Sequence, residues 1–256
     1  MLWLTTPPPL RGTRTSFLGR LQVGEFSSII GLIKRAQTAY GWLFTVSGVI
    51  AGFRRKALQD AGWWSSSTLT EDVDVTWRIQ MAGWRVTYGP SVLVWILMPE
   101  TLDGLWRQRL RWAEGGVQMM LDYASGIVRL HSPGLIPVYA NYVLSVIWSY
   151  AMLFSLLAGL ADLFGLTRFG LVVGLSLIPA WWGLILAITY LLQALVSHVI
   201  ERRYEGDMLR SLFWVIWYPA AYWLISAATT VVAVPKVLFG RKNSRGTWVS
   251  PDRGLR

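Results

Sequence analysis

Three long stretches without a charged residue dominate the second half of this 256-residue chain. They cover residues 138–160, 169–200 and 211–235. About 20 apolar residues in a helix, at a rise of 1.5 Å per residue, match the roughly 30 Å hydrocarbon core of a bilayer. Each stretch is long enough to span a membrane, and the middle one, which contains Pro179, has length to spare for a kink or a tilt. We therefore predict an all-α transmembrane region of about three helices over residues 138–235.

Composition supports the membrane assignment and excludes several kinds of site. Only 15% of the residues are charged, whereas a soluble domain has about 25%. The net charge of +10 comes from scattered Lys and Arg, which fit anchors at a lipid bilayer better than a nucleic-acid surface. We expect no nucleic-acid partner. The absence of cysteine excludes disulfides and thiolate chemistry, and two histidines, His131 and His198, are too few for a multi-histidine metal site.

The first 137 residues predict mixed α and β structure in water. An apolar, β-branched segment favours a strand and the loop that leaves it over residues 43–53, and two further strands are expected at residues 84–88 and 92–97. Helices are expected over residues 54–61 and 71–81, the second capped by Thr70 and ended by Gly83. A long helix from Thr101 to about Tyr123 is rich in Trp, Leu, Met and Arg, which is typical of a helix on a membrane surface.

Thr70-Glu71-Asp72 is the first candidate for chemistry. An acidic side chain at a helix start is stabilised by the free amides and by the positive end of the helix dipole, which keeps it ionised. Helix capping explains any lone Asp in this position equally well. Here Asp74 adds a third carboxylate within four residues. An ionised carboxylate suits a general base that removes the proton from an acceptor hydroxyl.

Gln108, Arg111 and Trp112 form the second candidate, because their spacing places them at neighbouring positions on a helix. Together they offer an amide, a guanidinium that can bind phosphate oxygens, and an indole that can stack on a sugar ring. The alternative is an amphipathic helix whose arginines meet lipid headgroups and whose tryptophan anchors it at the interface.

The two motifs in this order, followed by membrane spans, resemble the processive family 2 glycosyltransferases that make cellulose, chitin, hyaluronan and poly-N-acetylglucosamine. The resemblance implies that Asp72 is the general base, supported by Glu71 and Thr70. It implies that Arg111 contacts the diphosphate of the sugar donor, with Gln108 in support. Trp112 would stack on the acceptor sugar.

Within that family, the resemblance is closest to the bacterial biofilm synthases of poly-β-1,6-N-acetylglucosamine. It extends over residues 22–26, 45–55, 95–116, 216–219 and 247–254. In that group the segment around Ser47 and Gly48 lines the acceptor side of the cleft, although a tight turn after a strand explains these two residues nearly as well. The implied reaction is inverting transfer of N-acetylglucosamine from UDP-N-acetylglucosamine to a growing β-1,6-linked polysaccharide.

The family also implies a setting and partners. The protein would be a multi-pass protein of the bacterial inner membrane, with its catalytic part in the cytoplasm and the polymer exported through its helices. A small membrane subunit and regulation by cyclic di-GMP are further implications of the resemblance.

The implied fold is an α/β, Rossmann-like catalytic domain of the GT-A type. Residues 17–100 would be its C-terminal part, after an irregular start over residues 1–16 that reads as a beginning inside a larger protein. An interfacial helix over residues 101–125, the transmembrane region and a basic tail over residues 236–256 would follow.

The family binds Mg²⁺ or Mn²⁺ through an Asp-x-Asp motif that is not found before Asp72. Asp72-Val73-Asp74 spells the pattern but lies inside the base motif, so we assign no metal ligand in this chain and expect the ligands in a preceding segment. The 256-residue chain alone is expected to be inactive.

Other interpretations remain open. A hyaluronan-, chitin- or cellulose-type synthase would share Asp72 and the motif at residues 108–112, and a truncated, inactive membrane subunit would share the spans. Three full spans would place the basic tail outside, against the positive-inside tendency. Trp248 resembles the tryptophan of a cytosolic loop that gates the nucleotide in chitin and hyaluronan synthases, and a solvated basic tail is the alternative.

Overall fold

The structure is a computed structural model. It describes residues 3–4, 17–26, 31–90, 93–94, 98–129, 134–166, 181–202, 213 and 218–240. Trp248 and the rest of the basic tail after residue 240 lie outside these residues. So do residues 5–16 of the predicted irregular start, residues 169–180 of the second apolar stretch and most of residues 211–217 of the third.

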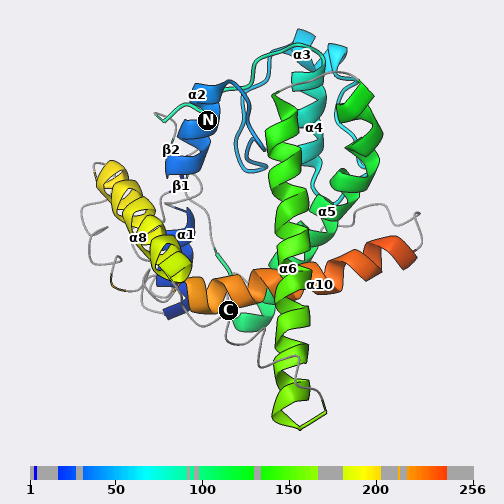
Figure 1. Cartoon of the computed structure of the whole chain (residues 1–256). Coiled ribbons are helices and arrows are strands. Elements are labelled where there is room, and N and C mark those ends of the chain that lie inside the picture. The colour runs from blue at the N-terminus through cyan, green and yellow to red at the C-terminus, as the bar shows by residue number, and fades with distance from the viewer. Residues whose placement is uncertain are drawn as a thin grey trace.

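Helices make up most of the described chain (Figure 1). In chain order the elements are β1 Trp3–Leu4, α1 Phe17–Phe26, α2 Lys34–Tyr40, α3 Arg55–Asp60, α4 Glu71–Met81, β2 Leu93–Val94, α5 Leu102–Arg129, α6 Leu135–Leu163, α8 Trp181–Glu201 and α10 Tyr218–Phe239. The helices predicted at residues 54–61, 71–81 and 101–123 are confirmed as α3, α4 and α5, and α5 runs six residues further than expected.

The predicted Rossmann-like α/β domain is wrong. Within the described residues, strand is confined to β1 and β2, each of 2 residues, which pair in parallel. The strands expected at residues 43–53 and 84–88 are irregular instead. Their backbone groups bond to helix side chains rather than to other strands: the Leu43 amide donates to Gln80 Oε1 at 2.8 Å, and the Tyr88 amide donates to Thr38 Oγ1 at 2.9 Å. Extended segments satisfied in this way do not build a sheet.

Helix α4 lies at the centre of the packed region because two of its faces are apolar. Val73 and Trp77 pack against Met119 of α5 and Leu135 at the start of α6. On the other face, α4 packs against α3, through the residues Ala57, Ala61, Val75 and Ile79. Four-residue spacing on each face predicts this arrangement. Helix α4 is therefore fixed on both sides, and its first residues have a defined position.

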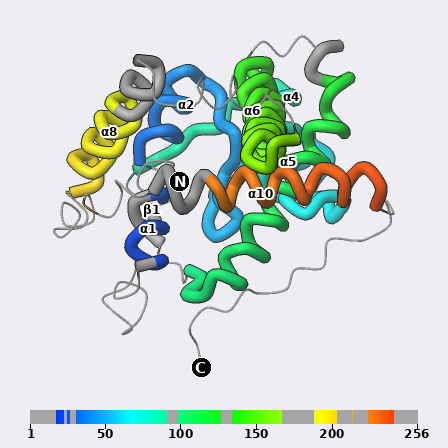
Figure 2. Tube along the Cα trace, turned by 60° about the horizontal axis from the view of Figure 1, so that its bottom comes forward, coloured from blue at the N-terminus to red at the C-terminus, as the bar shows by residue number. Residues whose placement is uncertain are grey.

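Helices α5, α6 and α10 meet below α4. Helix α5 begins at a side-chain cap, in which the Gly104 amide donates to Thr101 Oγ1 at 3.1 Å. Helix α10 packs against α5 and α6 and lies across α6 in both the ribbon and the tube view (Figures 1 and 2). Helix α8 lies apart from them and contacts α2 through Arg35 and Glu201, whose charged atoms are 3.9 Å apart.

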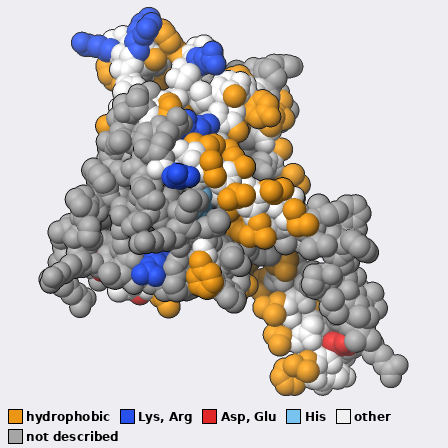
Figure 3. Space-filling model, turned by 90° about the vertical axis from the view of Figure 1, so that its left-hand side faces the viewer, with side chains coloured by type: hydrophobic (Ala, Val, Ile, Leu, Met, Phe, Trp, Pro, Cys, Tyr) orange, Lys and Arg blue, Asp and Glu red, His pale blue; other side chains and the backbone are white. Residues whose placement is uncertain are grey.

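Helix α6 is long and apolar enough to cross a membrane, and it is the one helix of that kind in the described part of the chain. Its far end projects away from the rest of the molecule (Figure 1). Large apolar side chains along α6 are exposed, namely Ile136, Leu144, Ile147, Trp148, Phe154, Leu156, Leu157, Leu160 and Leu163. Figure 3, from the side on which α8 lies, shows hydrophobic side chains both across the body and on the projection. The other two predicted spans remain predictions.

Candidate active site

Asp72 lies in the first turn of α4, as the sequence predicts, but its surroundings differ from a simple cap. Its Oδ1 accepts a hydrogen bond from the Val73 amide at 2.9 Å. Thr70 does not cap the helix with its side chain. Its carbonyl instead accepts the amides of Val73 and Asp74, at 3.1 and 3.2 Å. The helix start is thus closed by backbone groups, and the Asp72 carboxylate is not needed to hold α4 together.

The segment from Leu43 to Val46 runs along α4 and is held by three of its side chains. Gln80 bonds both the amide and the carbonyl of Leu43, at 2.8 and 2.9 Å. Trp77 Nε1 donates to the Phe44 carbonyl at 2.9 Å, and the Val46 amide donates to Thr76 Oγ1 at 2.9 Å. These bonds replace a strand ladder. They carry the chain toward the start of α4, where Ser47 and Gly48 follow.

Gly48 lies beside the Asp72 carboxylate. A Cβ atom built on Gly48 would be 3.6 Å from Asp72 Oδ2, which is ordinary van der Waals contact. Gly48 is exposed, and the Val49 amide donates to Ser47 Oγ at 3.4 Å, which makes a tight turn. The segment thus forms a turn, as one interpretation from the sequence has it, and the turn lies against Asp72; that it lines the acceptor side of a cleft remains a prediction. Because position 48 is a glycine, no side chain covers Oδ2 from that direction.

The electrostatic surroundings of Asp72 make it a stronger base than an ordinary aspartate. Burial raises the pKa of Asp72, and the neighbouring charge of Glu71 raises it further. The charge of Lys34 opposes this rise. Lys34 is itself buried at the start of α2, and burial lowers its pKa to about 8, while the charge of Asp72 acts in the opposite direction. Asp72 and Lys34 thus form an electrostatically coupled pair.

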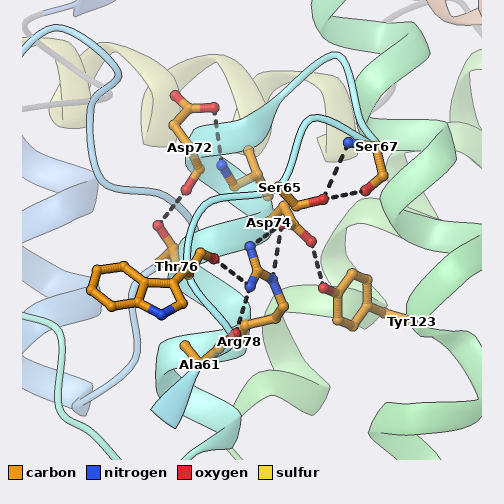
Figure 4. Close-up of polar contacts among 10 residues, drawn as sticks. Ala61, Ser65, Ser67, Asp72, Asp74, Thr76, Arg78 and Tyr123 are labelled. Atoms are coloured by element: carbon orange, nitrogen blue, oxygen red, sulfur yellow. Dashed lines mark hydrogen bonds and ion pairs between the residues drawn. The ribbon is translucent and has the colours of Figure 1, made fainter. Parts of the chain in front are cut away.

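Asp74 has a structural role. Its Oδ2 accepts two hydrogen bonds from Arg78, at 2.6 and 2.9 Å, and its Oδ1 accepts one from the Tyr123 hydroxyl at 2.5 Å. Arg78 also donates to the carbonyls of Ala61 and Trp63. Figure 4 shows the Asp72 carboxylate on a different side of α4 from the Asp74–Arg78 pair. With both Asp74 oxygens engaged and the two carboxylates directed apart, Asp72-Val73-Asp74 does not fit a divalent cation.

One face of α5 holds the loop that leads into the Thr70-Glu71-Asp72 motif. Arg111 Nη1 donates to the Leu69 carbonyl at 3.1 Å, and the Leu69 amide donates to Gln118 Oε1 at 3.1 Å. Between these two residues, Gly115 lies against Thr70: an added Cβ would be only 2.5 Å from Thr70 Oγ1. The spacing of Arg111, Gly115 and Gln118 places all three on one side of a helix. The two sequence motifs are therefore joined through Arg111.

Trp112 and Gln108 do not share that contact. The Trp112 ring lies over the Arg109 guanidinium, with 4.3 Å between Cζ and the ring centroid, and meets Phe26 of α1 edge to face at 6.4 Å. Gln108 Oε1 is buried without a hydrogen-bond partner among the described residues. The structure thus brings together Thr70, Asp72, Gly48 and Arg111, while Trp112 is directed toward α1. Trp248 lies outside the described residues.

Lys34 is a site residue that the sequence analysis missed. It follows an apolar run, Ile29–Ile33 with Gly31 inside it, and carries the first charge after Glu25. A lysine in such a position is rarely buried unless it is paired. This pattern signals a buried amine but does not identify its partner, because Asp72 is distant in the sequence.

Comparison with known proteins gives the family. The family model for glycosyl transferase family group 2 matches residues 5–233. A poly-beta-1,6-N-acetyl-D-glucosamine synthase of Staphylococcus aureus is 37% identical over 252 residues, covering 98% of this chain and 60% of the relative. The Staphylococcus epidermidis synthase of the same name is 34% identical over 253 residues, with the same coverage. No solved structure matches the chain.

The chain belongs to glycosyl transferase family group 2. It spans about three fifths of the length of the curated relatives that it matches. Family membership generally implies use of a divalent metal ion. Among the described residues, no group of three or more His, Asp or Glu side chains could hold one.

Proposed function

We propose that this chain is part of a membrane-embedded, inverting glycosyltransferase that adds N-acetylglucosamine to a growing β-1,6-linked polysaccharide. The observation that carries the proposal is the surroundings of Asp72: a partly buried carboxylate of raised pKa beside a glycine without a side chain. Similarity to the staphylococcal poly-beta-1,6-N-acetyl-D-glucosamine synthases supports the choice of sugar and linkage.

In the proposed reaction, Asp72 Oδ2 accepts the proton of the acceptor 6-hydroxyl. The hydroxyl oxygen then forms a bond to the anomeric carbon of the donor sugar. The bond from that carbon to the UDP oxygen breaks on the opposite face, and UDP leaves with the electron pair. A single displacement inverts the configuration, so no covalent intermediate with the protein is required.

The remaining site residues are assigned supporting roles. Glu71 keeps the pKa of Asp72 raised through its charge. Arg111 holds the Leu69 carbonyl and contacts the donor diphosphate, since a guanidinium carries five N–H donors. Gln108 supports Arg111, Thr70 positions the loop against α5, and Ser47 and Gly48 line the acceptor side. Trp112 stacks on the acceptor sugar.

The proposed setting is a multi-pass protein of the bacterial inner membrane with the site on the cytoplasmic side. The exposed apolar surface of α6 supports a position in a bilayer. UDP-N-acetylglucosamine and the polymer are the proposed ligands, and a small membrane subunit under cyclic di-GMP control is a proposed partner. Mg²⁺ or Mn²⁺ would assist UDP release, but the described residues do not supply its ligands, and no step above depends on it.

The test is an assay of the full-length protein in membranes with UDP-N-acetylglucosamine, followed by linkage analysis of the product. A β-1,6-linked N-acetylglucosamine polymer is the expected result. A product with β-1,3 or β-1,4 linkages would move the protein to the hyaluronan, chitin or cellulose type. Absence of UDP release under all donor sugars would reject an enzymatic role and favour a non-catalytic membrane subunit.

A further inference from the structure

Three side chains of α1 reach the start of α5. Gln22, Glu25 and Phe26 lie at the spacing that places residues on one helical face. Gln22 is fully buried, and its Nε2 donates to the carbonyl of Pro99, shortly before α5, at 2.8 Å. Helix α1 is thereby fixed against the chain that enters α5.

Glu25 forms a buried ion pair with Arg109. The distance from Arg109 Nη2 to Glu25 Oε2 is 2.7 Å, and the two side chains are 7% and 4% exposed. Burying two charges is unfavourable unless their geometry is good, and leaving one of them unpaired is strongly destabilising. A pair of this kind serves better to fix a geometry than to add stability.

The geometry that the pair fixes is that of Trp112. The Arg109 guanidinium lies 4.3 Å from the centroid of the Trp112 ring, and Phe26, adjacent to Glu25, meets the same ring edge to face. A planar guanidinium against an indole restricts the rotation of that indole. Both neighbours of Trp112 are therefore fixed through α1.

The two arginines of the segment at residues 108–112 have separate tasks. At 100° per residue, Arg109 and Arg111 leave α5 in nearly opposite directions. Arg111 bonds to the Leu69 carbonyl, on the side of the Asp72 loop, whereas Arg109 bonds to Glu25 on α1. One side of α5 therefore contacts the loop that leads into Thr70-Glu71-Asp72. The opposite side carries Arg109, which contacts Trp112 and α1.

We infer that Glu25 and Arg109 are positioning residues that set the orientation of the Trp112 indole for stacking on the acceptor sugar. This inference rests on the proposed function for the identity of the stacked ligand. The orientation of Trp112 does not depend on the proposed function, because the contacts with Arg109 and Phe26 determine it.

The test uses the full-length protein labelled with 5-fluorotryptophan, in which the Trp112 signal is identified by Trp112→Phe. In Glu25→Gln we expect the ¹⁹F resonance of Trp112 to shift and broaden. The KM for an acceptor oligosaccharide should rise roughly tenfold while the KM for UDP-N-acetylglucosamine stays within about twofold. Arg109→Lys keeps the charge but not the planar group. It should therefore also shift the resonance, and it should raise the acceptor KM by a smaller factor than Glu25→Gln does.

Glu114→Gln is the matched control. It removes another ion pair of α5, the one between Glu114 and Lys236 at 2.6 Å, whose side chains are not among the Trp112 contacts described above. It should change neither reading. An unchanged Trp112 resonance in both Glu25→Gln and Arg109→Lys would overturn the inference. Arg109→Lys decides alone if Glu25→Gln does not fold. A shifted resonance in a protein that turns over no UDP-N-acetylglucosamine would support the positioning and reject the proposed function.

Discussion

Helices α4 and α6 meet at one end, yet they are built for different surroundings. Seven of the 11 residues of α4 are buried, including Asp74, Thr76 and Gln80. Three of the 29 residues of α6 are buried. Helix α4 also holds irregular backbone through polar side chains, whereas α6 carries many exposed apolar side chains although it packs against α5 and α10. The first arrangement suits a site in water, and the second suits a helix surrounded by lipid.

The junction of the two helices joins the long apolar helix to the packed region that holds the candidate site. Leu135, at the start of α6, is fully buried against Val73 and Trp77 of α4. Further along α6, Val146 and Ser149 are also buried, and the Tyr150 hydroxyl donates to the Val231 carbonyl of α10 at 3.1 Å, whereas no residue of α6 after Ser149 is buried. The first half of α6 therefore packs against α4, α5 and α10, and the second half, after Tyr150, projects from them.

The largest effect is expected at Asp72, which lies in the first turn of α4 and is the proposed general base. In the full-length protein, Asp72→Asn should reduce polymer synthesis by a factor of about 10² to 10⁴, which is the usual contribution of a general base. Binding of UDP should persist. Radiolabelled sugar incorporation in membranes provides the measurement, with Asp122→Asn, an exposed position on α5, as the matched control. Synthesis at the wild-type rate would remove Asp72 from the role.

A charge in the exposed part of α6 should prevent its insertion. Leu156 is 60% exposed, and an arginine near the centre of a span costs about 2.5–3.5 kcal/mol on the insertion scale. Leu156→Arg should move a large share of the protein from the integral to the carbonate-extractable membrane fraction. Tyr40→Arg, on α2 and 84% exposed, should leave the distribution unchanged. Equal extraction of both variants would mean that α6 does not lie in lipid.

Removing a polar group from α4 should destabilise the site region. Gln80→Leu leaves the buried amide and carbonyl of Leu43 without their partner, and each unsatisfied buried group costs about 1–3 kcal/mol. Thermal unfolding of the detergent-solubilised protein should show a lower midpoint. Gln59→Leu on α3, where the side chain is exposed, is the control, and a midpoint equal to that of the control would show that Leu43 is held in another way.

The smallest effects are opposite shifts in the dependence of activity on pH. The charge of Glu71 raises the pKa of Asp72, so Glu71→Gln should lower it and move the acid limb of kcat/KM to lower pH. The charge of Lys34 lowers the pKa of Asp72, so Lys34→Met should move the same limb to higher pH. Lys34, with a pKa of about 8, carries its charge throughout that limb. Shifts in the same direction would contradict the assignment of Asp72 as the titrating base.

Helix boundaries were predictable because they depend on local residues. Val73, Trp77 and Met81 at four-residue spacing define the core face of α4, and Gly83 follows its end in the left-handed conformation, at φ +82°. The failure over residues 43–53 has a physical cause. An apolar, β-branched pattern predicts an extended backbone but does not identify what that backbone bonds to, and here the partners are Thr76, Trp77 and Gln80.

The same limit applies to the site. Short motifs predict Asp72 and Arg111 as site residues, and a resemblance predicts Gly48. Glu25 and Arg109 are not predicted, although a charged residue in an otherwise uncharged part of α1 is a signal of a buried pair. The contact joins residues 84 apart in the chain, and nothing in the local spacing relates them.

The contact between Gly115 and Thr70 links substitutions in α5 to substitutions in the Thr70-Glu71-Asp72 motif. Because a methyl group at position 115 would overlap the Thr70 side chain, a substitution there is tolerated only after position 70 has become smaller. Substitutions at positions 70 and 115 are therefore expected to occur together. A library that randomises both should return combinations of similar total volume, so an exchange of the Thr70-Glu71-Asp72 motif should require a matching residue at position 115.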